Sequence, residues 1–550
     1  MINHALLNRC RNLSPPETMT KEHRFPEWKN AKNGTIQFRS AWLIPLLSVL
    51  VFALPVRSEQ PPLSPRDVLF YEVDHNKNLT LTDMHWQQVA ELDEDGVTVI
   101  AGYFDALDWN TYDVSFDPVT LPWLQRGILF LPPGYPQGLK AGAANKAVLY
   151  NSHDVDPGSE RFYYTWGVEL ARAFNIPVLL HGWDPALTLP AGYNSVHEMQ
   201  FPLVDHFLDS GFCRWGDVPL DGSYGINGNI LVKGDMVAIT LLQRLAEQKG
   251  GNVTRVGSLG ISKEGGSHWI LAAIDDRVEV VAPGGDYAQD MHALDEAYFR
   301  EWGSQDHSGS PPDLNIARIT HRLDSWAGST EMGRILNRIN NPAEFSNDIY
   351  ARYVLMNGDV TLQSMHDRAF PLGAEQVFLD GFESVPWSYV RIPDGSGVLL
   401  DDNMSERAYS LLPMVADKLI NDANYPSVIN VQYEVSPDHR FRVIAELADS
   451  DLPELTVSLW AATSTTRWWT QVVQGEWIES AMTRMSGNTW VSDWSVQVPA
   501  DQAAAFLVEA KTTAHQGNYW FYRIDTSQPQ FLWQRPSPDP LVRYLLPPCR

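Results

Sequence analysis

A serine stands at a sharp turn between an apolar stretch and a helix-like stretch near the middle of the chain. The run 253–274 opens as a short apolar strand pattern, turns at Gly260-Ile-Ser262 and continues with helical spacing. A serine on such a strand-to-helix turn is raised at the end of its strand, where its hydroxyl can attack a carbonyl carbon. The free N–H groups at the start of the helix point to where an oxyanion would form, and the backbone N–H of Lys263 is the natural first donor. The spacing departs from Gly-x-Ser-x-Gly, because Glu264 holds the second glycine position and Gly265 follows it.

Acyl transfer by serine also requires an acid and a histidine, which in this arrangement follow the serine in that order. Asp359 stands where the acid belongs, because Asn357-Gly-Asp359 directly follows the predicted strand 349–356. The alternative is that Asp359 is simply a turn residue, because Asn, Gly and Asp are common in ordinary turns. The histidine should follow the predicted strand 387–392, but the stretch 393–402 contains none. The sequence therefore predicts a nucleophile and an acid and leaves the histidine position empty.

Several side chains remain as alternatives for the missing base, and all are weaker candidates than a histidine in the usual place. They are His153, His181, His268, His366 and Lys263. Two of them, His153 and His181, each end a predicted strand at the edge of the sheet that carries Ser262. His268 lies one and a half turns into the helix and is expected to be a packed or surface residue. The segment around Ser152 and His153 is also expected to supply the second oxyanion donor.

The sequence predicts neither a metal site nor a cofactor. His153-Asp154 and His307 have no partners at the spacing of a zinc motif, and no glycine-rich phosphate loop is found. The composition is that of a globular protein, with 44% apolar and 20% charged residues. A formal charge of −26 argues against binding to nucleic acid or anionic lipid. We therefore expect a small-molecule or peptide substrate, or a protein partner.

The first 58 residues are expected to form a leader. Basic residues precede the apolar run 41–56, which is short for a membrane span and suits a signal peptide with cleavage after Ser58. Met19 is an alternative start, and an uncleaved anchor is an alternative fate. The protein is expected to be exported to the periplasm or the extracellular space. Beyond the leader only Cys213 and Cys549 remain, which allow at most one disulfide.

Residues 68–425 show the pattern of one α/β domain. Extended runs up to residue 132 predict an antiparallel entry, and strands and helices then alternate up to residue 283. Such alternation predicts a mainly parallel sheet with helices on both faces, and together with the serine turn it favours an α/β-hydrolase-like fold. A mostly helical excursion, 284–348, precedes the predicted strands 349–356 and 387–392 and a closing helix at 405–421. The predicted elements of the alternating part are strand 146–150, helix 161–174, strand 176–181, helix 234–248, the Ser262 strand and helix, and strand 278–283.

Residues 426–527 predict a second domain, an immunoglobulin-like β-sandwich, followed by a tail at 528–550. Short strand patterns recur there at sandwich-like spacing, and 490–498 is predicted as one strand with Trp490, Trp494, Val496 and Val498 on one face. The many tryptophans are expected in the sandwich core or the domain interface, and a sugar-binding platform is the alternative. Limited proteolysis is expected to cut first between Asn421 and Ser427.

The stretch around the serine turn carries a specific motif, in which Gly260-Ile-Ser-Lys-Glu-Gly265 is followed by Trp269 and by Ala272-Ala-Ile-Asp-Asp-Arg-Val278. In these residues the chain resembles the PhoPQ-activated pathogenicity-related family of exported α/β-hydrolase-like proteins. Further landmarks between residues 68 and 524 are Glu296-Ala-Tyr298, Asn341-Pro-Ala-Glu-Phe345, Asn357-Gly-Asp359 and Val457-Ser-Leu-Trp-Ala-Ala-Thr463. The resemblance implies a hydrolase domain followed by a β-sandwich, and a distant likeness to serine peptidases and esterases.

The chain departs from that family at two places. The family has an asparagine–small–glycine–histidine turn after the last core strand, where this chain has Asp394-Gly-Ser-Gly397. The family's Arg-Asp-Phe-Arg run is replaced here by Arg467-Trp-Trp-Thr470. Two functions from different classes follow: an exported serine hydrolase acting on an ester or amide, or a catalytically inactive hydrolase-fold protein that binds a partner or ligand.

Overall fold

The structure of the chain is a computed structural model. It describes residues 73–112, 118–154, 160–183, 228–261, 263–284, 349–357, 385–391, 410–449, 451–464, 477–494, 496–498, 502–527 and 530–533. All of these lie in the compact unit Leu63–Arg550. The predicted leader, the excursion 284–348 beyond Gly284 and residues 534–550 of the predicted tail lie outside the described residues, whereas residues 530–533 of that tail form a strand.

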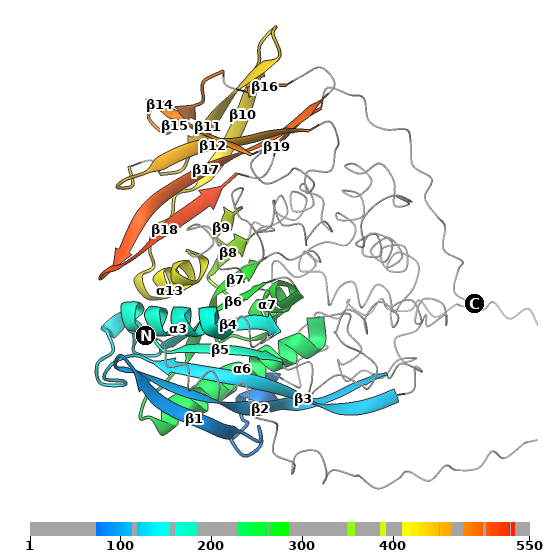
Figure 1. Ribbon diagram of the computed structural model, residues 1–550, viewed down its shortest axis with the longest axis vertical. Coiled ribbons are helices and arrows are strands. Elements are labelled where there is room, and N and C mark those ends of the chain that lie inside the picture. The colour runs from blue at the N-terminus through cyan, green and yellow to red at the C-terminus, as the bar shows by residue number, and fades with distance from the viewer. Residues whose placement is uncertain are drawn as a thin grey trace, which may run out of the picture. The chain divides into compact units, whose positions relative to one another are not determined.

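Nine strands of the described residues form one mixed sheet in the order β1-β2-β3-β5-β4-β6-β7-β8-β9 (Figure 1). The pairs among β1, β2, β3 and β5 are antiparallel, and all pairs from β5–β4 to β8–β9 are parallel. This is the predicted antiparallel entry into a parallel sheet, and it is an α/β-hydrolase-like sheet. The strands are β1 Gln87–Glu94, β2 Val97–Tyr112, β3 Pro118–Leu131, β4 Lys146–Asp154, β5 Val178–Trp183, β6 Arg255–Ile261, β7 Val278–Gly284, β8 Tyr353–Asn357 and β9 Trp387–Val390.

Helices cover both faces of this sheet. They are α3 Glu160–Phe174, α6 Gly228–Gln248, α7 Lys263–Ile274 and α13 Leu411–Asn421, with a short 3₁₀ turn at Ala141–Ala143. On β6 a Cβ added to Gly257 would meet Val415 of α13, whereas one added to Gly260 would meet α7. Residues three apart in a strand point to opposite faces, so α13 and α7 cover opposite faces. None of the helices in the described ranges is long and apolar enough to cross a membrane.

The core under α6 and α7 is built from the apolar side chains that periodicity predicts. Leu149, Leu179 and Val256 of the strands pack there with Val237 of α6 and Trp269 of α7. Helix α6 begins six residues before the predicted start at Gly234, because Leu231 and Val232 are buried as well. Two other expectations differ in detail. A helical turn occupies 73–77, where an extended run was expected, and the closing helix is described only from Leu411.

Ten further strands form two antiparallel sheets in the C-terminal part of the described chain. One sheet contains β10 Val428–Val435, β11 Arg440–Leu447, β14 Thr483–Ser486, β15 Thr489–Val491 and β16 Val496–Gln497. The other contains β12 Thr456–Ser464, β13 Ile478–Ala481, β17 Ala503–Gln516, β18 Tyr519–Thr526 and β19 Gln530–Trp533. Side chains from both sheets, such as Phe441 and Phe506, share one apolar core. These two sheets are consistent with the predicted β-sandwich.

The prediction of one continuous strand at 490–498 was wrong. The segment forms β15 and β16, separated by an interruption at Ser492–Trp494. Ser492 is buried there and its Oγ accepts a hydrogen bond from the N–H of Val443 at 2.9 Å. A side chain thus takes a bonding position that a regular ladder gives to a carbonyl, and the strand is interrupted.

Candidate functional site

The predicted strand–turn–helix junction around Ser262 is present. Strand β6 ends at Ile261 and helix α7 begins at Lys263. Ser262 itself lies outside the described residues. A Cβ on Gly260 would clash with the carbonyl oxygen of Glu264 and lie 2.6 Å from Cδ2 of His268, so only glycine lets α7 pass this close. The first turn of the helix therefore lies against the end of its own strand.

Gly265 explains the departure from Gly-x-Ser-x-Gly. A Cβ on Gly265 would clash with the carbonyl oxygen of Gly284, at the end of β7. The small residue is therefore needed against the neighbouring strand, and it serves that purpose one position later than the motif has it. Glu264, at the motif's second glycine position, is buried.

Two of the other predicted site residues, His153 and Lys263, lie at the edge of the sheet where β4 and β6 end. Asn151 of β4 lies opposite Gly260, and Gly284 of β7 lies opposite both Ile261 and Asn357. His153 is part of β4, two residues after Asn151, and Lys263 is the first residue of α7. Asp359 and His366 lie outside the described residues; along the chain Asp359 comes two residues after the end of β8.

A buried polar cluster that local sequence patterns do not predict lies at this same edge. Asp235 of α6 is completely buried, and so are His181 of β5 and His268 of α7. Nε2 of His181 is 3.2 Å and Nε2 of His268 is 3.6 Å from Oδ1 of Asp235. The amide of Asn151 donates to Oδ1 at 2.7 Å and the hydroxyl of Ser267 donates to Oδ2 at 2.7 Å. The cluster therefore joins β4, β5, α6 and α7 through one carboxylate.

The Asp235 carboxylate is held in its charged form. Burial by itself raises the pKa of this group, but the His268 ring and then the His181 ring outweigh burial and hold the pKa below its usual range. Gln125 of β3 completes the arrangement, because its Oε1 lies 2.8 Å from Nδ1 of His181. In the described part of the chain no group of three or more His, Cys, Asp or Glu residues is arranged to hold a metal ion.

A signal for this cluster was present in the sequence. Asp235 stands in an apolar helical stretch, between Leu231-Val232 and Met236-Val237. A carboxylate in such a position is buried with the helix face and must find donors there. From the sequence, His181 and His268 are only weak substitutes for a base, whereas the structure places both beside Asp235.

Asp275 and Arg277, part of the motif that carries the family resemblance, form a buried ion pair that holds two helices together. Nη2 of Arg277 lies 2.6 Å from Oδ2 of Asp275, and its guanidinium also donates to Oγ1 of Thr240 at 2.8 Å and to the carbonyl of Met236 at 3.1 Å. This buried pair joins the end of α7 to the middle of α6. It lies at the opposite end of α7 from the Ser262 junction.

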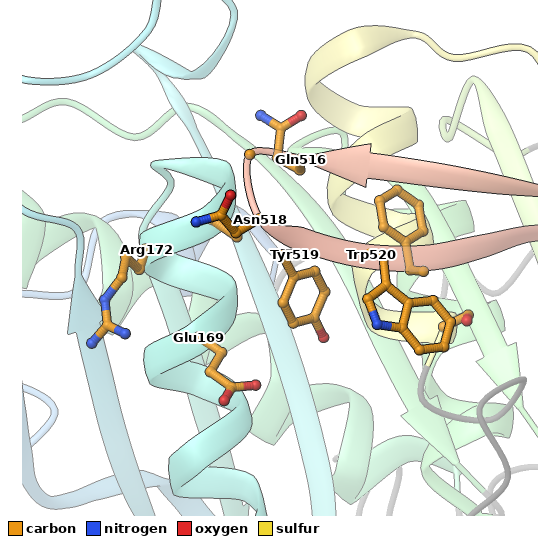
Figure 2. Close-up of a pocket in the computed structure, with 10 residues that line it drawn as sticks. Glu169, Arg172, Gln516, Asn518, Tyr519 and Trp520 are labelled. Atoms are coloured by element: carbon orange, nitrogen blue, oxygen red, sulfur yellow. The ribbon is translucent and has the colours of Figure 1, made fainter.

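A second place with binding character is a hollow of about 680 Å³ between α3 and the β17–β18 hairpin (Figure 2). Tyr519 lies between Glu169 of α3 and Trp520 there, whereas Arg172 points away from them. Trp520 is 44% exposed. Burial raises the pKa of the Glu169 carboxyl, although Arg172 opposes this. The hollow thus combines an exposed indole with hydrogen-bonding side chains.

Among known proteins, similarity to the chain was found only in solved structures. No protein-family model matches the chain, and no curated protein matches it in sequence. An acetyl xylan esterase from Paenibacillus sp. R4 is 13% identical, with 62% of this chain and 92% of that one covered and a TM-score of 0.34. Acetyl xylan esterase 1 from Thermoanaerobacterium sp. JW/SL YS485 is 13% identical, with 64% and 95% covered and a TM-score of 0.33. The rice cell wall degrading esterase LipA from Xanthomonas oryzae is 13% identical, with 60% and 93% covered and a TM-score of 0.30. At these scores the fold assignment rests on the strand order of the chain itself.

Proposed function

We propose that this chain is a serine-hydrolase-like protein that acts, if it turns over, on an ester or amide bond with Ser262 as nucleophile. The observation that carries the proposal is the β6–α7 junction, where Gly260 and Gly265 let the helix start against the ends of two strands. A serine between such elements is the arrangement that presents a nucleophile to a carbonyl carbon. The backbone N–H of Lys263 is the proposed first oxyanion donor, and the segment around His153 is the proposed source of the second.

Asp359 is the proposed acid, because in the sequence it comes two residues after β8, and β8 ends at the sheet edge that carries the junction. The proposed assignment to the PhoPQ-activated pathogenicity-related family rests on the motif Gly260–Gly265 and on the Asp275–Arg277 pair. We also propose export, on the basis of the apolar run 41–56 after basic residues. Mass spectrometry of the mature protein should find its N-terminus near Glu59, and an intact leader in a soluble cytoplasmic fraction would contradict export.

The empty histidine position predicts slow chemistry. A serine at its ordinary pKa is a poor nucleophile, and enzymes that lose a triad member keep only about 10³–10⁴-fold catalysis over water from the oxyanion hole and binding. His181 and His268 are buried beside Asp235, so neither reaches a substrate from its observed position. His153, His366 and Lys263 remain the candidate bases.

A fluorophosphonate probe tests the proposal, because it reports an activated serine without knowledge of the substrate. We expect slow labelling of the wild type that is lost in Ser262→Ala and kept in Ser258→Ala, which alters a buried serine of the preceding strand β6. Loss in His153→Ala or His366→Ala would identify the base. Faster labelling of Gly397→His would show that the missing histidine is the defect. Labelling that survives Ser262→Ala would refute the nucleophile.

The alternative function is a catalytically inactive hydrolase-fold protein that binds a ligand, and the hollow beside Trp520 favours it. An exposed indole suits the apolar face of a sugar ring, and Glu169, Gln516 and Asn518 line the same hollow with groups that bond hydroxyls. Calorimetric titration with a xylo-oligosaccharide and a cello-oligosaccharide should then give binding that Trp520→Ala removes. Binding that is unchanged in Trp520→Ala, or absent in the wild type, would contradict this alternative.

A further inference from the structure

We infer that Asp235 is a positioning residue, which holds in place the two chain segments from which the oxyanion hole would be built. The role assigned to these segments rests on the proposed function; the contacts themselves do not. One segment is the end of β4, and the other is the first turn and a half of α7. Both are fixed to the same buried carboxylate by short hydrogen bonds.

The first bond fixes the end of β4. Nδ2 of Asn151 donates to Oδ1 of Asp235 at 2.7 Å, across 84 positions of the chain. Asn151 is the last β4 residue paired in register with β6, where it lies opposite Gly260. The backbone two residues later, at His153, is the proposed source of the second oxyanion donor. Movement of Asn151 therefore moves that donor.

The second bond fixes the start of α7. Oγ of Ser267 lies 2.7 Å from Oδ2 of Asp235 and 2.9 Å from the carbonyl oxygen of Glu264. Its single hydroxyl proton is shared between these two acceptors. Because Glu264 directly follows Lys263, the carboxylate is linked to the residue whose N–H is the proposed first donor. Donors of an oxyanion hole contribute only when they are held at a fixed distance from the developing charge.

The two histidines make a buried charge tolerable at this place. A carboxylate without exposed surface is costly unless hydrogen-bond donors face it. The Nε2 atoms of His181, on β5, and of His268, on α7, both face Oδ1. Gly234 contributes as well, since a Cβ there would clash with Nε2 of Gln125, whose Oε1 orients the His181 ring. The carboxylate is therefore a fixed point shared by four elements.

The location of the cluster distinguishes positioning from general stability. The apolar core between α6, α7 and the sheet is large and does not depend on Asp235 for its contacts. The end of α7 remote from Ser262 has its own buried link through Asp275 and Arg277. Loss of the Asp235 bonds should thus loosen the sheet edge while the rest of the layer stays packed.

The test compares Asp235→Asn with Asp417→Asn in the full chain. Asp417 is a matched control, since it is equally buried and bonded to Arg523 and Asn421, but on the opposite face of the sheet. Hydrogen exchange is followed by mass spectrometry in peptides 146–154 and 261–267. Fluorophosphonate labelling is followed as its maximal rate and its half-saturating concentration.

For Asp235→Asn we expect faster exchange in both peptides. We also expect a maximal labelling rate about 10–100-fold lower, with the half-saturating concentration unchanged; this loss is smaller than the roughly 10²–10³-fold cost of removing an oxyanion donor outright, because the donors are loosened and not removed. Asp417→Asn should lower the melting temperature but leave hydrogen exchange in both peptides and the labelling rate unchanged. If Asp235→Asn does not fold, Ser267→Ala should raise exchange only in 261–267 and Asn151→Ala only in 146–154.

Unchanged exchange in both peptides of Asp235→Asn would overturn the inference, and so would equal changes in Asp417→Asn. In the single-bond variants, changes that do not follow the bond removed would overturn it too. A wild type that the probe does not label at Ser262 would refute the proposed function alone. In that case the exchange data still decide whether Asp235 holds the two segments.

Discussion

Gly260 decides how closely α7 approaches the end of β6. Because a Cβ there would meet the backbone of Glu264 and the buried ring of His268, neither of which is a flexible side-chain end, the helix itself must shift. The same contact connects the junction to the Asp235 cluster, since His268 belongs to both. Packing at this residue is thus coupled to the geometry on which the proposed nucleophile depends.

We predict that Gly260→Ala lowers the free energy of unfolding by about 1–3 kcal/mol, the usual cost of overpacking. Gly127→Ala is the control, because its nearest contact is 3.3 Å, to the terminal Cδ2 of Leu241, which can move aside. That control should cost clearly less. Urea unfolding of both variants measures the difference, and equal losses would show that α7 is not fixed against β6.

At the scale of elements, side chains of β18 join the C-terminal sheets to the β9 edge of the nine-stranded sheet. The buried carboxyl group of Asp525 accepts hydrogen bonds from the backbone N–H of Tyr389 at 2.9 Å and of Val428 at 2.7 Å. Oγ1 of Thr526 lies 3.0 Å from the N–H of Arg391, and the hydroxyl donates to the carbonyl of Tyr389 at 3.1 Å. The edge strand β9 is thus covered by side chains instead of being left open for another strand.

The Asp525 carboxyl makes this junction dependent on pH. Burial raises its pKa to about 7 from the ordinary 3.8, although the bonds from Val428 and Tyr389 oppose the shift. The folded protein therefore keeps a proton that the unfolded chain releases near pH 4. The contribution of this bound proton to the free energy of unfolding is complete below pH 4, declines as the pH rises and is lost above about pH 7. From the size of the pKa shift, the contribution is on the order of 4 kcal/mol.

Asp525→Asn should remove this dependence, because the amide does not titrate. We expect the variant to be less stable than the wild type at pH 4, and the gap in melting temperature to narrow steadily up to pH 8. Calorimetry of both proteins at pH 4, 6 and 8 measures the gap, in which the other carboxyl groups cancel. A gap that stays constant or widens with pH would contradict the assigned protonation of Asp525.

At the scale of the whole molecule, the connection between the nine-stranded sheet and the C-terminal strands is partly buried, whereas its sequence suggests an exposed linker. Residues 422–427 lack regular structure, yet Ala423 and Tyr425 are buried. The carbonyl of Ala423 accepts from Nζ of Lys418 at 3.0 Å, and the hydroxyl of Tyr425 donates to the carbonyl of Met414 at 2.8 Å. Backbone fixed in this way does not enter a protease active site without local unfolding.

We therefore predict that the native protein resists limited proteolysis at 422–427, in place of the early cut expected from the sequence. Arg523→Ala should make this connection cleavable, because it leaves the buried Asp417 without the guanidinium that donates to it at 2.7 Å. Arg442→Ala, which removes an exposed ion pair with Glu434, should leave the cleavage pattern unchanged. Early cleavage of the wild type at 422–427 would contradict the prediction.

Much of the architecture was predictable because its signals are local. Apolar runs with strand and helix periods predicted the alternation from β4 to β7, and glycines around Ser262 predicted the tight strand–helix turn. Both depend on residues within a few positions of one another, where backbone sterics and side-chain spacing decide the outcome. The break between β15 and β16 escaped the same reasoning, because it depends on a hydrogen bond from Val443 to Ser492, 49 residues away.

The sequence by itself determined the α/β sheet, the position of the serine turn and the absence of a histidine after the last strand of that sheet. Only the tertiary structure decided that Asp235, His181, His268, Asn151 and Ser267 share one buried cluster. These residues stand on four elements, and Asp235 is 84 positions from Asn151 and 32 from Ser267. Their meeting depends on the strand order β5-β4-β6 and on α6 packing beside α7. Local periodicity carries no record of which elements become neighbours, so the physical partner of a buried carboxylate becomes known only when the sheet is assembled.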